Sequence, residues 1–85
     1  MGQKIVFSDH SFAQMIERGT RREEVETAIL KGEKVPAKKG RHAYRINFQY
    51  EQLWDEKWYA MKQVMPIVKE DDDELIVITV YVFYF

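Results

Sequence analysis

The sequence of 85 residues has no cysteine, only two prolines and four glycines, and no long uninterrupted apolar run. Without cysteine the chain has no disulfide framework, no thiolate zinc site and no cysteine nucleophile. The longest apolar stretch, Leu75 to Phe85, has 11 residues and is interrupted by Thr79, so it is too short to span a bilayer. The first residues lead into only three apolar positions, too few for a signal-peptide core. We therefore expect a soluble, cytoplasmic protein without membrane contact.

The composition favours one folded domain over residues 1–85. Apolar residues make up 46% of the chain and aromatic residues 14%, which argues against intrinsic disorder although 32% of the residues are charged. A chain of this length supports one modest hydrophobic core, because a second core needs more residues.

Charge is divided unevenly along a chain whose net charge is only −1. Residues 1–46 contain ten basic and six acidic residues, whereas residues 47–85 contain three basic and eight acidic residues. Six of the basic residues fall between Lys31 and Arg45, with His42 among them. Such a cluster binds phosphates only if the fold gathers it on one face, and otherwise it is a solvated loop.

Capping signals predict a hairpin of two short helices. Ser8 or Asp9 caps a first helix, and Gly19 supplies the left-handed residue that ends it. The run Thr20-Arg21-Arg22-Glu23 is predicted as a capping box that opens a second helix, which Gly32 closes.

The rest of the pattern is that of a sheet. Tyr44 to Tyr50 alternates apolar and polar residues, the period of a strand with one buried face. Residues 33–42 are predicted as a loop and residues 51–56 as a turn. The chain is therefore predicted to form an α+β fold of order β-α-α-β-β-β, a largely antiparallel twisted sheet with the two-helix hairpin packed on one face. Its predicted strands are residues 4–7, 44–50, 58–68 and 75–85.

Residues in two of the predicted strands indicate where each strand lies in the sheet. Pro66 lacks an amide donor, so it belongs at a sheet edge or at a bulge. The last strand is apolar on both faces, which places it in the middle of the sheet or against a partner. Strict alternation puts Thr79 and Tyr81 on the same face as Leu75 and Val77.

Several segments together resemble one family. They are Phe7-Ser8-x-His10, Glu17-Arg18-Gly19-Thr20 followed by Glu24-Val25-Glu26, Lys31-Gly32-Glu33, Arg41 to Arg45, and Val77-x-Thr79-Val80-Tyr81. Over nearly its whole length the chain is similar to the small prokaryotic domain of unknown function 4258. The resemblance implies a compact α+β domain related in architecture to RelE-like and BrnT-like ribonuclease toxins of toxin–antitoxin pairs. The chain departs from the family in Ser11, where alanine is common, and in its aromatic end, residues 82–85.

His10, Lys62 and Tyr81 are the candidate catalytic residues for metal-free RNA cleavage, which needs a base, an acid and cations. An imidazole titrates near neutral pH, so His10 is the acid/base candidate, and a structural role beside the second helix is its alternative. Lys62 interrupts an apolar strand, so its ammonium must pair with a carboxylate or open into a cleft. Tyr81 is either a hydrogen-bond donor to substrate or a core residue with a satisfied hydroxyl.

Arg18, Arg41, Arg45 and His42 are the candidate residues for binding RNA phosphates. Arg45 lies on the polar face of its predicted strand, where a solvated arginine is the simpler interpretation. Arg18 has a structural alternative, in which its alkyl stem covers the helical hairpin and its head group binds carbonyls at the helix end. His42 is a second acid/base candidate, although it lies in a loop.

No cofactor and no metal are predicted. The acidic run Glu70 to Glu74 lacks the glycine and ligand spacing of a calcium loop, so we predict a solvated turn. The sequence also lacks a glycine-rich phosphate loop, a metal-binding histidine pair and a serine-nucleophile motif.

Two hypotheses on function follow. The first is an RNA-binding, toxin-like domain, in its strongest form a metal-independent ribonuclease acting on free or ribosome-associated RNA and neutralised by a protein antitoxin. The second is a non-enzymatic interaction module whose last aromatic strand forms a homodimer or docks a partner. The first requires that His10, Lys62, Tyr81 and either Arg41 or Arg45 meet in one cleft, and dispersal of these groups favours the second.

Overall fold

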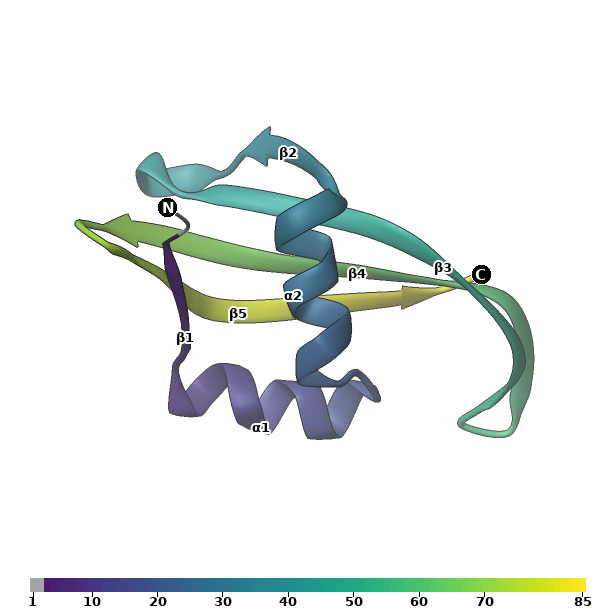
Figure 1. Cartoon of the computed structure of the whole chain (residues 1–85). Helices are drawn as coiled ribbons and strands as arrows, with labels where there is room; N and C mark the ends of the chain where they lie inside the picture. Colours follow the sequence, from purple (N-terminus) through teal and green to yellow (C-terminus); the bar gives the residue numbers. More distant parts are fainter. Residues whose placement is uncertain (1–2) are drawn as a thin grey trace.

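A computed structural model describes residues 3–85, so Met1 and Gly2 of the segment considered above as a leader lie outside the described residues. The strands form a five-stranded sheet of order β1-β5-β4-β3-β2. Strand β1 runs parallel to β5, and the other neighbours are antiparallel (Figure 1). The predicted α+β fold is confirmed. Its elements in chain order are β1 (Lys4–Phe7), α1 (Asp9–Arg18), α2 (Arg22–Lys31), β2 (Glu33–Pro36), the 3-10 turn η1 (Lys38–Gly40), β3 (His42–Trp54), β4 (Lys57–Asp71) and β5 (Glu74–Tyr84).

Both helices begin near the predicted caps, but the second uses a different residue. The Ser8 hydroxyl accepts a hydrogen bond from the first turn of α1, as predicted. Helix α2 has Arg21 as its N-cap residue, and the Glu24 carboxylate accepts the Arg21 amide at 3.1 Å and the Thr20 hydroxyl at 2.9 Å. The predicted partnership of Thr20 with Glu23 is therefore wrong, because Glu24 is the residue three positions after the N-cap.

The predicted loop over residues 33–42 contains a strand. Residues Glu33–Pro36 form β2, which pairs antiparallel with the first residues of β3. The chain reverses through η1, where Lys39 and Gly40 take φ values of 62° and 71°. A four-residue strand with a single apolar side chain has no clear alternation, and its proline is tolerated because β2 lies at the sheet edge.

The hairpin between β3 and β4 is longer than predicted. Its turn is confined to Asp55 and Glu56, both with positive φ (51° and 68°), rather than extending over residues 51–56. The positive φ of Glu51 (50°) accompanies a register shift between Gln49 and Gln52. Pairing then continues to the tip, so the hairpin projects beyond the helices as the curved arm at the right of Figure 1.

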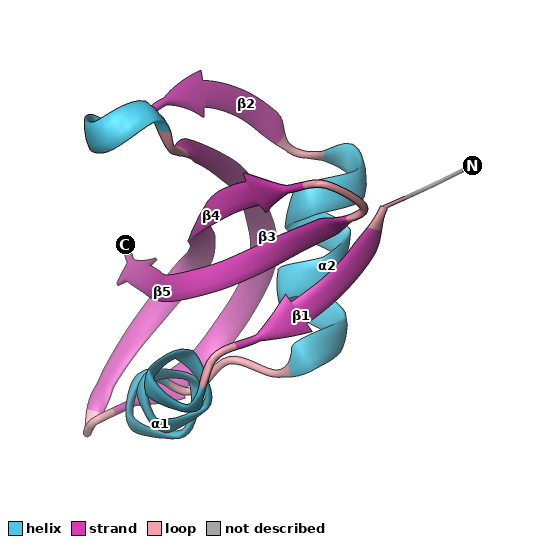
Figure 2. Cartoon of the chain, turned by 90° about the vertical axis from the view of Figure 1, so that its left-hand side faces the viewer, coloured by secondary structure: helices cyan, strands magenta, loops and turns pink. Residues whose placement is uncertain are grey.

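Helix α2 packs over β3 and β4, and α1 packs against β5 (Figure 2). The core between helices and sheet consists of buried residues from both layers, among them Met15, Val25, Ile29, Tyr44, Val64, Val68, Leu75, Val77 and Val80. In the part of the chain that the structure describes, no helix is long and apolar enough to cross a membrane.

The predicted central position of the last strand is confirmed, since β5 lies between β1 and β4. Pro66 lies in β4, also a central strand, so its predicted edge position is wrong. Met61 and Phe85 exchange two backbone hydrogen bonds, at 2.8 and 3.1 Å. Because such pairs alternate along an antiparallel ladder, Pro66 directs its missing donor toward β3. The ladder to β5 shifts register next to it, which agrees with the bulge alternative.

This bulge reverses the predicted facing of two residues in β5. Ile67 pairs with Thr79 and Val68 with Val77, so Ile78 is an additional residue on β5. Beyond it, Val80 faces the core, and Tyr81 pairs with Met65 on the opposite face. Placing Thr79 and Tyr81 on the face of Leu75 and Val77 was wrong, because one inserted residue moves every later side chain to the other face.

Candidate functional site

The sheet face opposite α2 contains a cleft of about 440 Å³. One wall is formed by the edge strand β2 and by η1, which lies away from α2 in Figure 2, and the floor by β3, β4 and β5. Its volume falls in the lower part of the range for sites of small organic ligands. The lining residues are Val35, Pro36, Ala37, Lys38, Lys39, Arg41, Ala43, Met65, Ile67, Thr79 and Tyr81.

Three cations lie at the η1 wall of the cleft. Lys38 and Lys39 are exposed and Arg41 is half-buried. Within residues 3–85 none of the three forms an ion pair. The neighbouring basic side chains do, since Lys34 lies 3.5 Å from Glu70 and Arg45 lies 2.7 Å from Glu33. Only part of the basic segment therefore keeps its charge available.

The opposite wall is aromatic. The side chain of Tyr81 is 41% exposed and stacks on Phe83 with ring centroids 6.3 Å apart and an interplanar angle of 17°. The guanidinium of Arg18 lies over the Tyr81 ring, 5.4 Å from its centroid. Despite these two contacts the ring remains partly exposed, so it offers an apolar surface next to the cationic wall.

Helix α1 holds the outer edge of β5 where β1 ends. Gln14 and Arg18 lie one helical turn apart and reach the same strand residue. The carbonyl oxygen of the Gln14 side chain accepts the Val80 amide at 2.9 Å and also the Thr79 hydroxyl. Arg18 Nη1 donates to the Val80 carbonyl at 2.6 Å. These side chains replace the missing neighbouring strand, so Arg18 binds a carbonyl of the sheet rather than carbonyls at its own helix end.

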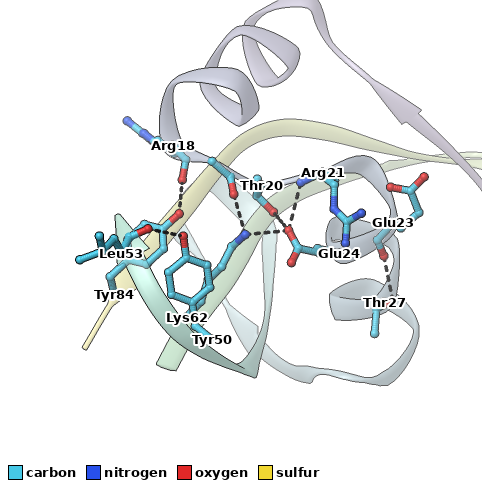
Figure 3. A network of polar contacts seen from close by, with 11 residues as sticks. Arg18, Thr20, Arg21, Glu23, Glu24, Thr27, Tyr50, Leu53, Lys62 and Tyr84 are labelled. Carbon is cyan, nitrogen blue, oxygen red and sulfur yellow. Dashed lines mark hydrogen bonds and ion pairs between the residues drawn. The ribbon is translucent and has the colours of Figure 1, made fainter. Parts of the chain in front are cut away.

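Lys62 lies on the other face, beneath the helices, and is only 4% exposed. Its ammonium donates to a Glu24 carboxylate oxygen at 2.8 Å (Figure 3) and also to the Gly19 carbonyl at 2.5 Å. It also lies 5.7 Å from the centroid of the Tyr50 ring. Of the two predicted environments, pairing with a carboxylate is the one observed.

Further hydrogen bonds hold Glu24 and the connection between α1 and α2 in place around Lys62. Burial alone would raise the pKa of Glu24, but hydrogen bonds from Lys62 and Thr20 outweigh it and hold the pKa below its ordinary value of 4.5. The Tyr84 hydroxyl donates to the Arg18 carbonyl at 2.7 Å, and burial raises the pKa of Tyr84 to about 12. This network joins the α1–α2 connection to β4 and β5.

The two histidines and Arg45 lie outside the cleft lining. His10 is exposed in the first turn of α1. The buried Nδ1 atom of His42 has no hydrogen bond in the described part of the chain and lies 3.7 Å from Glu70. Arg45 projects on the open face but is paired with Glu33. In residues 3–85 no group of three or more His, Asp or Glu side chains is placed to hold a metal.

A sequence profile of the domain of unknown function 4258 matches residues 7–82. The chain belongs to this family. No curated protein and no solved structure matches the chain. The match confirms the resemblance to the domain of unknown function 4258.

In this member of the family, the predicted site residues separate into two sets. Arg41 and Tyr81 line the cleft, and Arg18 contacts the Tyr81 ring. Lys62 lies on the opposite face of the sheet, so the catalytic candidates do not meet in one cleft, and this dispersal favours a non-enzymatic module over the ribonuclease. Sequence reasoning missed Lys38 and Lys39 as site residues. Their signal was weak, namely two adjacent lysines before the glycine of a predicted loop.

Proposed function

We propose that this domain binds single-stranded RNA in the cleft on the open face of its sheet. One observation carries the proposal: three cations without ion-pair partners in residues 3–85 line the same cleft as an exposed tyrosine ring. Proteins that bind single strands combine cations for the phosphates with aromatic rings on which unpaired bases stack.

The proposed binding mode assigns one role to each wall. Lys38, Lys39 and Arg41 contact phosphate oxygens, and Arg41 is also able to contact two oxygens of one phosphate at once. An unpaired base stacks on Tyr81, with Met65 and Ile67 beneath it. Paired bases do not expose their faces, so a duplex loses the stacking contribution and keeps only its phosphate contacts.

Binding without cleavage is the form of the proposal that the geometry supports best. The Lys62 ammonium already has a carboxylate, a carbonyl and an aromatic face as partners. Releasing it to a phosphate would leave the Glu24 carboxylate without its cation, which is costly at a buried site. RNA, rather than DNA, is favoured by the architectural relation to ribonuclease toxins that the sequence resemblance implies.

Fluorescence anisotropy with a labelled single-stranded RNA of about 12 nucleotides tests the proposal. The wild type is compared with K38A/K39A and with the control K4A/K31A, which removes two exposed lysines outside the cleft. We expect roughly tenfold weaker binding for the cleft variant and an unchanged dissociation constant for the control. The recovered RNA is expected to be intact on a denaturing gel.

Equal affinity of both variants, or no binding by the wild type, would overturn the proposal. Light scattering on the same samples tests the competing hypothesis, a non-enzymatic module that forms a homodimer through its last strand. A homodimer that forms without RNA and is lost in a Phe83→Ser variant would identify the exposed aromatics of β5 as a protein interface.

A further inference from the structure

Resting on the proposed function, we infer that the cleft recognises a short unpaired segment, with one base in the cleft and no more than three phosphates in contact. The site therefore differs in kind from the long cationic grooves that follow a strand over many nucleotides.

The available cations occupy a very short stretch of chain. Lys38, Lys39 and Arg41 fall within four consecutive residues at one wall of the cleft. The chain extends at most about 3.5 Å per residue, so their backbone positions span roughly one to two nucleotides. Three cations contact at most three phosphates, and most of the cleft lining that remains is apolar.

The volume of the cleft also limits the ligand. A site of about 440 Å³ lies near the lower end of the range that accommodates one small organic molecule. One base with its ribose is a ligand of this class. Neighbouring nucleotides must then lie outside the cleft.

Beyond the cleft the surface offers one further exposed cation, Lys69, which follows Ile67 on the open face of β4. On the open face, Arg45 is neutralised by Glu33 at 2.7 Å, and the side chains of Gln63 and Asn47 bond to each other at 3.0 Å. In the other direction, β4 continues from the cleft floor through Lys69 to the acidic β4–β5 turn, where Glu70 pairs with Lys34 of β2. An RNA leaving the cleft meets neutral or paired side chains in one direction, and in the other it meets Lys69 followed by the run of five acidic residues at 70–74.

Competition with unlabelled RNAs of one to about 12 nucleotides measures the length of the recognised segment. After correction for the number of binding positions on each RNA, we expect affinity to rise up to about three nucleotides and then to remain constant. Salt titration between about 50 and 200 mM should give a slope of log affinity against log salt near −2, about 0.7 for each phosphate.

The variant Glu33→Gln sharpens the test, because it frees an arginine at the boundary of the cleft without changing the lining. We expect the salt slope for the longest RNA to steepen by about 0.7. A wild-type slope much steeper than −2, or affinity that rises more than about tenfold between three and 12 nucleotides, would overturn the short-segment inference. Failure of the longest RNA to bind at all would instead overturn the proposed function.

Discussion

The two faces of the sheet use their cations differently. On the covered face Lys62 is buried and its ammonium binds a carboxylate and a carbonyl. On the open face Lys38, Lys39 and Arg41 line a cleft and have no ion-pair partner among the described residues. Lys62 therefore stabilises the packing of the helices on the sheet, whereas the three cations of the cleft remain available to a ligand.

This difference shows why the position of a basic residue in the sequence is a poor guide to its role. Lys62 stood out because it interrupts an apolar strand, yet its charge is used within the fold. Lys38 and Lys39 did not stand out within the basic stretch from Lys31 to Arg45, yet their charges are unpaired within residues 3–85. The partner of a charge, rather than its rarity in a pattern, decides whether it can bind RNA.

The largest expected effect is on the covered face. Replacing Lys62 by alanine leaves the Glu24 carboxylate partly buried and without its cation. We expect the free energy of unfolding to fall by about 3 kcal/mol, the lower end of the range for broken buried pairs. Urea denaturation followed by circular dichroism measures it, and a loss smaller than about 1 kcal/mol would contradict the structural role.

A double variant separates the ion pair from general damage to packing. Lys62→Met combined with Glu24→Gln removes both charges and keeps a side-chain oxygen that can accept the Arg21 amide and the Thr20 hydroxyl. We expect its stability to lie within about 1 kcal/mol of the wild type, because neither charge is left unpaired. A double variant as unstable as Lys62→Ala would show that the charges themselves contribute little.

The same pair predicts a dependence of stability on pH. The pKa of Glu24 is lower in the folded protein than its ordinary value of 4.5, so the stabilisation is present above pH 4.5. It is lost as the pH falls through the folded-state pKa. The difference in unfolding free energy between the wild type and Glu24→Gln should therefore narrow below pH 4.5. A constant difference from neutral to acidic pH would mean that the carboxylate is not stabilised by its partners.

Local signals in the sequence predicted most of the covered face. The Ser8 cap, the Gly19 helix end and the central position of the last strand depend on residue types at adjacent positions, and all three are confirmed. The need of Lys62 for a partner was also predicted from burial. Its partner Glu24 is 38 residues away, and no local rule selects it among 14 acidic residues.

The open face was harder to predict, because it depends on one bulge. The segment around Ile78 has neither glycine nor proline, and its residues favour a regular strand. The bulge lies where the Ser8 amide and hydroxyl bind the carbonyls of Val77 and Ile78, 69 and 70 positions along the chain. A contact between distant segments thus determines that Tyr81 faces the cleft rather than the core.

On the open face the largest expected effect is at Tyr81. Tyr81→Ala should weaken binding of single-stranded RNA by about tenfold, since stacking of one base contributes about 1–3 kcal/mol. Tyr81→Phe keeps the ring and should change the dissociation constant by less than about threefold. Trp58→Ala, which removes an exposed aromatic residue on the β3–β4 hairpin, is the matched control. Equal weakening in Tyr81→Ala and Trp58→Ala would indicate nonspecific stacking rather than a site in the cleft.

The smallest expected effect lies where the two faces meet, at Arg18. Arg18→Met keeps an unbranched stem near the Tyr81 ring but removes the donor to the Val80 carbonyl. One net hydrogen bond contributes about 1 kcal/mol, so thermal unfolding should shift by only a few degrees. RNA affinity should fall less than in Tyr81→Ala, because the cations of η1 are unchanged. A loss of affinity as large as that of Tyr81→Ala, at nearly unchanged stability, would mean that Arg18 itself binds phosphate, and the available cations would then lie on both walls of the cleft.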